Sequence, residues 1–352
     1  MKLWIVSNCR PNSGWGTYSE ALNYAVGDRA RFVNIFGSSS IGDCVGEKPL
    51  IPGNSRIMPV LARSFPKLYF HSLLQSITEE RRNGLIVHYA YNLLPLIGNP
   101  DIDIVTIHDL VFLSKWYLNE PRLRGLYSKQ LLKGYLKYRN IIADSGFIKK
   151  QLLSFSNTSE IEVISPPCSS AFRPIEVFGS DKKKLNLPED RILILSPSNN
   201  KRWKNLAMVS RVMKKLGDKF ILVRVGPDIG TGIAFNGVDT NTLNLLYNIS
   251  DILFFPSLEE GFGFPIVEAM RTGLPAVVSD IEVFHEIGGD AVEYVNPFDV
   301  DSMIAGIFRA LDNSEKLRDL GCRRAELYSL ETFKNKLCAY YDRISKRSIL
   351  TD

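Results

Sequence analysis

The stretch Pro256-Ser-Leu-Glu-Glu-Gly-Phe-Gly-Phe-Pro-Ile-Val-Glu-Ala-Met270 decides how we interpret this chain. The apolar run Asp251-Ile-Leu-Phe-Phe255 precedes it, and Pro265 suits the first turn of a following helix. The sequence therefore predicts a buried strand, a loop containing Gly261 and Gly263, and then a helix. Backbone N–H groups at the start of such a helix form a site for an anion such as a phosphate.

Two carboxylates flank the glycines of this loop. Glu260 lies in the loop itself, and Glu268 follows eight residues later in the expected helix. Carboxylates are good acceptors for vicinal hydroxyls, so this spacing lets one face a sugar while the other reaches a ribose diol. A plain strand–helix turn with a solvated acidic helix face would show the same residues, and the spacing alone leaves both interpretations open.

Short apolar runs alternate with helical patterns along the whole chain, and a Pro-rich break at 165–174 separates two series of them. Such alternation is typical of a parallel sheet covered on both faces, so we predict two α/β domains. The expected strands are 3–6, 32–36, 85–89, 104–107, 140–143 and 161–164, then 192–195, 220–225, 251–255, 276–278 and 291–294. The expected helices are 18–25, 122–138 and 145–155, then 205–216, 240–248, 265–272, 299–313 and 330–345.

The composition fits a globular protein of a reducing compartment. The chain has 352 residues, of which 45% are hydrophobic and 23% are charged, and this length suggests two domains. No apolar run approaches the ~18 residues of a membrane span, and the N-terminal apolar stretch is too short for a secretory signal. The five cysteines are odd in number and form no C-x-x-C pair. We therefore expect a cytoplasmic protein.

The segment from Glu260 to Glu268 resembles the E-x7-E motif of retaining GT-B glycosyltransferases, family 4 in particular (glycosyl transferases group 1). Its flanks, Asp251-Ile-Leu-Phe-Phe-Pro-Ser257 and Gly273-Leu-Pro-Ala-Val-Val-Ser279, are similar to that family too, which makes the match specific. The resemblance extends over nearly the whole chain, through Gly14-Trp-Gly-Thr-Tyr18, Thr106-Ile-His-Asp-Leu110, Ala143-Asp-Ser-Gly-Phe-Ile-Lys149, Glu162-Val-Ile-Ser-Pro166, Phe172-Arg-Pro174, Lys204-Asn-Leu206 and the helix at 330–345.

The resemblance implies two Rossmann-like α/β domains that face each other across a cleft. Residues 1–170 would bind the acceptor, residues 171–329 would bind the nucleotide sugar, and residues 330–352 would form a helix that packs back on the N-terminal domain. The implied reaction moves a hexose or deoxyhexose from a GDP- or UDP-linked sugar to a glycan or lipid-linked glycan, with retention of configuration. No cofactor or metal is expected. Asp101-Ile-Asp103 matches the letters of a metal-binding D-x-D motif, but it lies where a loop enters a strand of the acceptor-binding domain.

The same resemblance assigns roles to individual residues. His108 would contact the transferred sugar, Lys204 the leaving diphosphate, and Glu260 would position the sugar. Glu268 would hold the ribose, and the loop around 237–238 would meet the base. The expected donor-binding residues are Gly14, Trp15, Gly16, Lys201, Arg202, Gly237, Val238, Gly261, Phe262, Gly263, Phe264 and Glu268.

Elementary arguments bear on two of these roles. His108 ends an expected strand, where open α/β sheets bind ligands, although a lone histidine there is as readily structural. Lys204 closes the run Lys201-Arg-Trp-Lys204 before a helix, and cations are disfavoured at that end unless an anion is bound. Many family members carry an arginine five or six positions before this lysine, where this chain has Ser198 and Asn199. Lys201 or Arg202 is the candidate for that second charge.

Charge is spread unevenly along the chain. Residues 1–174 carry a net charge of +7, and residues 175–352 carry −2. The stretch 115–150 is rich in lysine and arginine, and five aromatic residues are interleaved: Trp116, Tyr117, Tyr127, Tyr135 and Tyr138. This composition is typical of contact with anionic lipid headgroups. We expect peripheral membrane contact through 115–139 and no nucleic acid partner, with a solvated face and inward-turned aromatics as the alternative.

Two other functions are compatible with this fold. A sugar-nucleotide epimerase needs carboxylates placed for elimination, and the sequence shows no such set beside His108. A non-catalytic sugar-nucleotide-binding subunit would not need His108, Lys204, Glu260 and Glu268 together. We therefore expect a hexosyltransferase of polysaccharide biosynthesis that uses GDP-mannose or a UDP-sugar.

Overall fold

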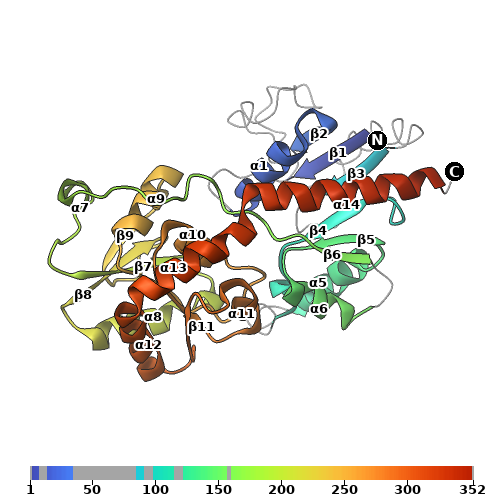
Figure 1. The fold of residues 1–352 in the computed structure, drawn as a ribbon. Helices are drawn as coiled ribbons and strands as arrows, with labels where there is room; N and C mark the ends of the chain where they lie inside the picture. The colour runs from blue at the N-terminus through green and yellow to red at the C-terminus, as the bar shows by residue number, and fades with distance from the viewer. Residues whose placement is uncertain are drawn as a thin grey trace, which may run out of the picture. The chain divides into compact units, whose positions relative to one another are not determined.

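The computed structural model of the protein describes residues 2–7, 14–34, 85–90, 98–114, 122–156 and 160–350. The chain divides into two compact units (Figure 1). The first unit consists of Met1–Pro167 together with Glu331–Asp352, and the second unit consists of Cys168–Leu330. Among the helices of the described residues, none has both the length and the apolar character needed to cross a bilayer.

The first unit is built on a six-stranded sheet in the order β2-β1-β3-β4-β5-β6, with every pairing parallel. Its strands are β1 (Lys2–Ser7), β2 (Ala30–Asn34), β3 (Leu85–Tyr89), β4 (Ile104–Ile107), β5 (Asn140–Ala143) and β6 (Glu160–Val163). Its helices are α1 (Gly14–Val26), α5 (Arg122–Tyr135), α6 (Gly146–Leu153) and α14 (Leu330–Leu350), with 3-10 turns at Gly27–Arg29 and Val111–Leu113.

The core of the first unit surrounds β3, β4 and β5, which are buried at every position. Parallel strands covered on both faces require such continuous apolar runs. The last helix, α14, supplies part of this cover: Phe333 meets the ring of Tyr18 at 5.7 Å between centroids, and Leu337 and Tyr341 are buried. The C-terminal helix therefore packs on the first unit, as Figure 1 shows.

The second unit is built on another six-stranded parallel sheet, in the order β12-β11-β10-β7-β8-β9. Its strands are β7 (Ile192–Pro197), β8 (Phe220–Val225), β9 (Ile233–Phe235), β10 (Ile252–Phe255), β11 (Ala276–Ser279) and β12 (Glu293–Val295). Its helices are α7 (Gly179–Lys184), α8 (Leu206–Leu216), α9 (Thr240–Ile249), α10 (Phe264–Thr272), α11 (Glu282–Gly288), α12 (Val300–Asp312) and α13 (Ser314–Ala325), with 3-10 turns η3 (Arg202–Lys204) and η4 (Glu326–Tyr328).

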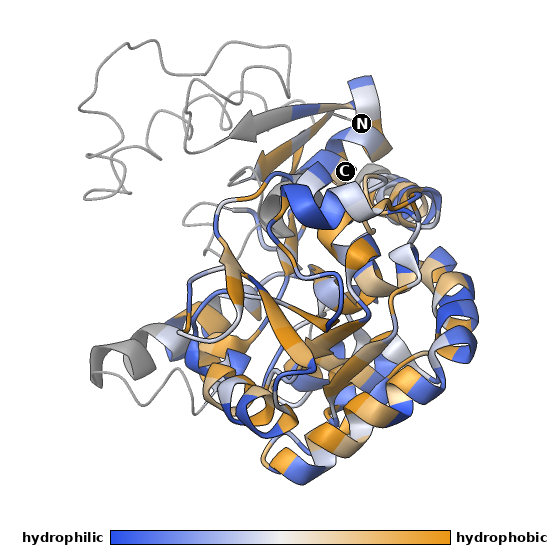
Figure 2. Cartoon of the chain, turned by 90° about the vertical axis from the view of Figure 1, so that its left-hand side faces the viewer, coloured by the Kyte–Doolittle hydropathy of each residue, from blue (hydrophilic) through white to orange (hydrophobic). Residues whose placement is uncertain are grey.

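The helices of this unit turn apolar faces to the sheet. Val209, Val212 and Met213 of α8 are buried, as are Met303 and Ile307 of α12, and all five belong to one core cluster with the central strands. Figure 2 shows the apolar strands inside and polar residues on the outer helix surfaces. The predicted fold class, two parallel α/β sheets, is confirmed.

Some elements differ from the sequence predictions. The short edge strand β9, the basic helix α7 and the helices α11 and α13 were not predicted. β9 has only three residues, and the apolar period that marks a strand needs more. The expected helix 122–138 ends at Tyr135, and the expected helix 330–345 continues to Leu350.

Candidate functional site

The strand order of the second unit reverses between β7 and β10. From β7 the sheet extends to β8 and β9 on one side, and to β10, β11 and β12 on the other. Open parallel sheets bind ligands outside the carboxyl ends of their strands at such a switch point. The loops that follow β7 and β10 carry Lys204 and Glu260, so both predicted residues lie at this position.

Direct contacts hold these two loops together. Lys204 Nζ donates to Glu260 Oε1, and the backbone N–H of Leu258 donates to the carbonyl of Trp203 at 2.7 Å. The side chains of Lys204 and Glu260 are only 13% and 14% exposed. The Lys204 ammonium also lies 5.2 Å from the centroid of the Phe255 ring. An ammonium has three donors, so Lys204 can keep Glu260 and still donate to a ligand oxygen.

The loop after β7 reaches Lys204 through one 3-10 turn. Asn199 Oδ1 accepts from the N–H of Lys201 at 3.1 Å, and η3 follows. The turn ends at Asn205, whose φ of 59° is a left-handed conformation that asparagine tolerates. Lys201 and Arg202 are exposed, in contrast to Lys204. Which of the two assists a ligand stays a prediction.

The glycine loop after β10 ends in the first turn of α10. Gly263 has φ +115°, a conformation that favours glycine, and a Cβ there would stand 3.0 Å from the ring of Phe284, a tight contact. Phe264 is the first helical residue, with Pro265 beside it. Gly261 and Phe262 are buried. The predicted anion-binding geometry, a glycine loop leading into a helix N-terminus, is present.

Glu268 lies on the second turn of α10 and is bound by α9. Tyr247 Oη donates to Glu268 Oε2 at 2.6 Å. Burial raises the pKa of Glu268 to about 7, against the Tyr247 hydrogen bond, which lowers it. Glu268 is therefore a carboxyl group that changes its charge near neutral pH.

The predicted base contact, Gly237-Val238, lies in the loop between β9 and α9. Gly237 is exposed and has φ +68°, a conformation that favours glycine. Asp239 follows and caps α9 by accepting from the N–H of Thr242 at 2.8 Å. This loop follows β9, an edge strand of the sheet. None of the contacts described for the second unit joins the loop directly to Lys204.

In the first unit, His108 follows β4 and pairs with a carboxylate that follows β5. His108 Nδ1 lies 2.8 Å from Asp144 Oδ2, and both side chains are almost fully buried. Burial opposes the charged imidazolium, but the adjacent Asp144 outweighs it and raises the pKa of His108. The sequence predicts no set of carboxylates placed for elimination beside His108, and the contact described here brings one carboxylate, Asp144, to it. β4 and β5 are neighbours in the sheet, so their carboxyl ends bring the two together.

A second buried histidine connects α14 to this region. His88 Nδ1 is hydrogen-bonded to Tyr341 Oη at 2.6 Å, and His88 Nε2 to Thr106 Oγ1 at 2.7 Å. Thr106 also meets Tyr18 Oη at 3.1 Å, and the Tyr18 ring packs edge-on against His108 at 4.7 Å. Burial lowers the pKa of His88 to about 3, so this imidazole is neutral. These hydrogen bonds hold the Tyr18 ring, which packs against His108, in place.

The segment Gly14-Trp15-Gly16, which is expected to bind the donor, forms the first turn of α1. The helix starts four residues earlier than predicted. A phosphate can still meet backbone N–H groups there, because the first turn of a helix has donors without intrahelical acceptors. Asp103, the second aspartate of the D-x-D letters, instead accepts from the N–H groups of Val87 and Asn99 at 3.1 and 2.7 Å.

The expected basic and aromatic surface separates into two parts. Tyr135 and Tyr138 are buried in the core of the first unit. Lys129, Lys133 and Lys137 are exposed. Trp116 and Tyr117 lie outside the described residues, as does the side chain of Tyr127. The described part of the surface is basic and lacks the interleaved aromatics.

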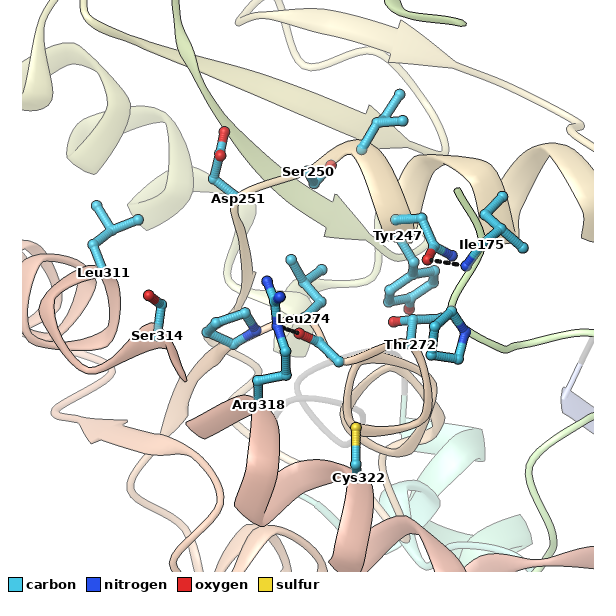
Figure 3. Close-up of a pocket in the computed structure, with 15 residues that line it drawn as sticks. Ile175, Tyr247, Ser250, Asp251, Thr272, Leu274, Leu311, Ser314, Arg318 and Cys322 are labelled. Carbon is cyan, nitrogen blue, oxygen red and sulfur yellow. Dashed lines mark hydrogen bonds between the residues drawn. The ribbon is translucent and has the colours of Figure 1, made fainter. Parts of the chain in front are cut away.

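A pocket of about 430 Å³ lies elsewhere in the second unit (Figure 3). It is lined by residues that precede β10 and β11, among them Asp251 and Pro275, and by Arg318, which donates to Gly273 O at 3.1 Å. Residues that precede parallel strands lie at the amino ends of those strands, whereas Lys204 and Glu260 lie beyond the carboxyl ends. None of the predicted site residues lines it.

Known proteins similar to this chain are glycosyltransferases. Residues 177–325, nearly all of the second unit, match the model of glycosyl transferases group 1. The chain is a glycosyltransferase. It is 27% identical to the O-antigen chain mannosyltransferase RfbU of Salmonella typhimurium over 86% of this chain and 80% of that protein. It is 26% identical to the serotype-specific mannosyltransferase WbdA of Escherichia coli over 64% of this chain and 31% of that protein.

The glycosyltransferase also resembles solved structures over nearly its whole length. The Anabaena protein HepE, solved in complex with UDP and glucose, superposes with a TM-score of 0.74 at 14% identity, covering 97% of this chain and 99% of that one. The likeness at this identity concerns the fold, which is GT-B.

Sequence reasoning did not single out three side chains that contact predicted site residues or the loop that carries one: Asp144 in the first unit, and Tyr247 and Arg224 in the second. Asp144 follows a predicted strand directly and could have been found as a polar residue at a carboxyl end. Arg224 is a charge inside the apolar strand Phe220-Ile-Leu-Val-Arg-Val225, which is unusual in a buried strand. Tyr247 gives no signal in the sequence, because its hydrogen bond to Glu268 depends on the packing of α9 against α10.

Proposed function

We propose that this glycosyltransferase moves a mannosyl group from a nucleoside-diphosphate sugar, GDP- or UDP-linked, to a hydroxyl of a glycan or lipid-linked glycan. The observation that carries the proposal is the Lys204–Glu260 pair at the switch point of the second sheet, beside the glycine loop that opens α10. The choice of mannose rests on the two relatives described above, both of which are named mannosyltransferases.

The donor would be held by three groups of the second unit. The diphosphate would receive N–H donors from the first turn of α10 and the charge of Lys204. Glu260 would accept from hydroxyls of the sugar, and Glu268 from the ribose. The charge of Lys204 is well suited to catalysis, because a preorganised cation stabilises the negative charge that develops on the leaving phosphate.

We infer that the transfer retains configuration, as the resemblance to family 4 implies. The anomeric C–O bond to the diphosphate breaks and its electron pair leaves with the phosphate oxygen. The acceptor hydroxyl then forms the new C–O bond on the same face and gives up its proton to the leaving phosphate. His108, held by Asp144, would contact the transferred sugar. No step in this scheme uses a metal, so we propose that none is needed.

The acceptor side is proposed to lie at a membrane surface. Lys129, Lys133 and Lys137 are exposed on α5 and the turn after it, spaced four residues apart. Side chains four apart share one face of a helix, so Lys129 and Lys133 lie on the same face of α5, and Lys137 follows two residues after its end. Each basic residue near an anionic surface contributes about 1 kcal/mol to binding. This face would bring the first unit to a lipid-linked acceptor.

The function is tested by incubating the purified chain with GDP-mannose, GDP-fucose, UDP-glucose and UDP-galactose, each with a lipid-linked glycan acceptor, in buffer containing EDTA. We expect release of one nucleoside diphosphate and an acceptor heavier by one hexose, with the anomeric configuration of the donor. Turnover of a sugar nucleotide without acceptor and without hydrolysis would indicate an epimerase. Binding without turnover would indicate a sugar-nucleotide-binding subunit.

A further inference from the structure

Arg224 is a cation buried inside the sheet of the second unit. It lies on β8 opposite Ser196 of β7, and it is fully buried. Its Nη1 donates to the carbonyls of Ser196 and Val225, and its Nη2 to those of Ser198 and Asn199. Burial lowers the pKa of Arg224 to about 10, which leaves it charged at neutral pH.

The partners of this guanidinium are all neutral. Within the described residues, no carboxylate forms an ion pair with Arg224. A buried charge is costly unless it is paired, and carbonyl dipoles compensate it only in part. A positive charge in this position therefore favours the binding of an anion near the carboxyl ends of β7 and β8. Where no anion is bound, the buried charge lowers the folding stability.

The carbonyls that receive Arg224 belong to the loop that leads to Lys204. Asn199, whose carbonyl accepts from Nη2, also accepts at its side chain from the N–H of Lys201. Gly226 completes the contact from β8: it has φ +131°, and a Cβ there would stand 2.1 Å from the carbonyl oxygen of Ser198. The loop and the end of β8 thus meet backbone to backbone, with the guanidinium between them.

Ser198 and Asn199 stand at the two positions where the resemblance noted in the sequence implies an arginine. The guanidinium of Arg224 donates to the carbonyls of both. We propose that Arg224 is a positioning residue of the donor site: it holds the β7 loop and supplies, from behind the backbone, positive charge that favours the diphosphate of the donor. This inference rests on the proposed function of the same site.

The test separates a charge effect on the diphosphate from a general loss of structure. For wild type and Arg224→Met, one measures the affinity for GDP and UDP by calorimetry and for guanosine and uridine by ligand-observed NMR. The ratio of diphosphate to nucleoside affinity should fall about tenfold in Arg224→Met, with nucleoside affinity nearly unchanged. Arg211→Met, on the exposed face of α8, removes an equal charge from the same unit and should leave the ratio intact.

A second variant keeps the test decisive if Arg224→Met does not fold. Arg224→Lys retains a charge, but a buried ammonium loses its proton at lower pH than a guanidinium. The ratio should therefore fall between pH 6 and pH 9 in Arg224→Lys relative to wild type. Equal losses for diphosphate and nucleoside, or a ratio that follows wild type at every pH, would overturn the inference. A wild-type protein that binds no nucleoside diphosphate would instead overturn the proposed function.

Discussion

The charge of Glu268 should control donor affinity through pH. Burial raises its pKa to about 7, and Tyr247 donates to it at 2.6 Å. If the ribose hydroxyls donate to Glu268, they need the carboxylate, because the protonated acid presents a donor in place of one acceptor. The acid form dominates below pH 7, so the affinity for a nucleoside diphosphate should fall as the pH is lowered through 7.

The expected size follows from the pKa. With a pKa of about 7, roughly nine in ten molecules carry the carboxylate at pH 8 and roughly one in ten at pH 6. The dissociation constant of the diphosphate should therefore rise about tenfold between these two pH values. Isothermal titration calorimetry in buffers from pH 5.5 to 8.5 measures it. Tyr247→Phe removes the donor that lowers the pKa, so its midpoint should lie at higher pH.

Glu268→Gln supplies the matched control. The amide keeps the shape of the side chain but does not titrate in this range, whereas the second phosphate ionisation of the ligand, near pH 6, is common to both proteins. The difference between the two pH profiles therefore belongs to Glu268. Identical profiles for wild type and Glu268→Gln would refute the assignment of Glu268 to the ribose.

Three further outcomes are expected. Lys204→Ala should lower turnover by about 10²–10³-fold and donor affinity much less, because its charge acts most strongly as the bond to the diphosphate breaks; steady-state kinetics beside calorimetry checks this, and equal losses would make Lys204 a binding residue only. Asp144→Asn removes the carboxylate that raises the pKa of His108, so this imidazole should titrate at lower pH by NMR, and an unchanged titration would contradict the pairing. Anionic vesicles should sediment the wild-type protein at low salt but not at high salt. They should not sediment a variant in which the exposed Lys129, Lys133 and Lys137 are replaced by glutamate, whereas the same replacement at 182–184 in α7 is the control. Wild-type protein left in the supernatant at low salt would make the surface a solvated face.

Much of the sheet architecture could be predicted from the sequence. The strands Leu85–Tyr89, Ile104–Ile107, Asn140–Ala143 and Phe220–Val225 have the predicted bounds, because short β-branched and aromatic runs between turn residues are the strongest strand signal. The glycine loop and its two glutamates were found from local spacing. The Lys204–Glu260 pair follows from the resemblance together with a strand order that no single segment contains.

What the sequence could not supply are contacts between distant segments. Tyr341 and His88 are 253 residues apart, and only the packing of α14 on the first sheet makes them partners. The carboxylate of Asp144 reaches His108 because β4 and β5 are adjacent, and adjacency of strands is a property of the whole fold. Side-chain partners of this kind set pKa values, so the protonation states of His88, His108 and Glu268 were beyond prediction from residue types.

Arg224 shows how a local departure and a distant residue can be linked. The loop after β7 lacks the arginine that the resemblance implies, and the sequence offers Lys201 or Arg202 as its nearest replacements. Those two side chains are exposed, so solvent screens their interaction with an anion. Arg224 is instead fully buried against the carbonyls of Ser198 and Asn199. A charge acts more strongly in a low-dielectric interior than in water. On the proposal above, the buried guanidinium of the neighbouring strand adds to the two exposed cations of the loop, and the diphosphate-to-nucleoside ratio should respond to position 224 more than to 201 or 202.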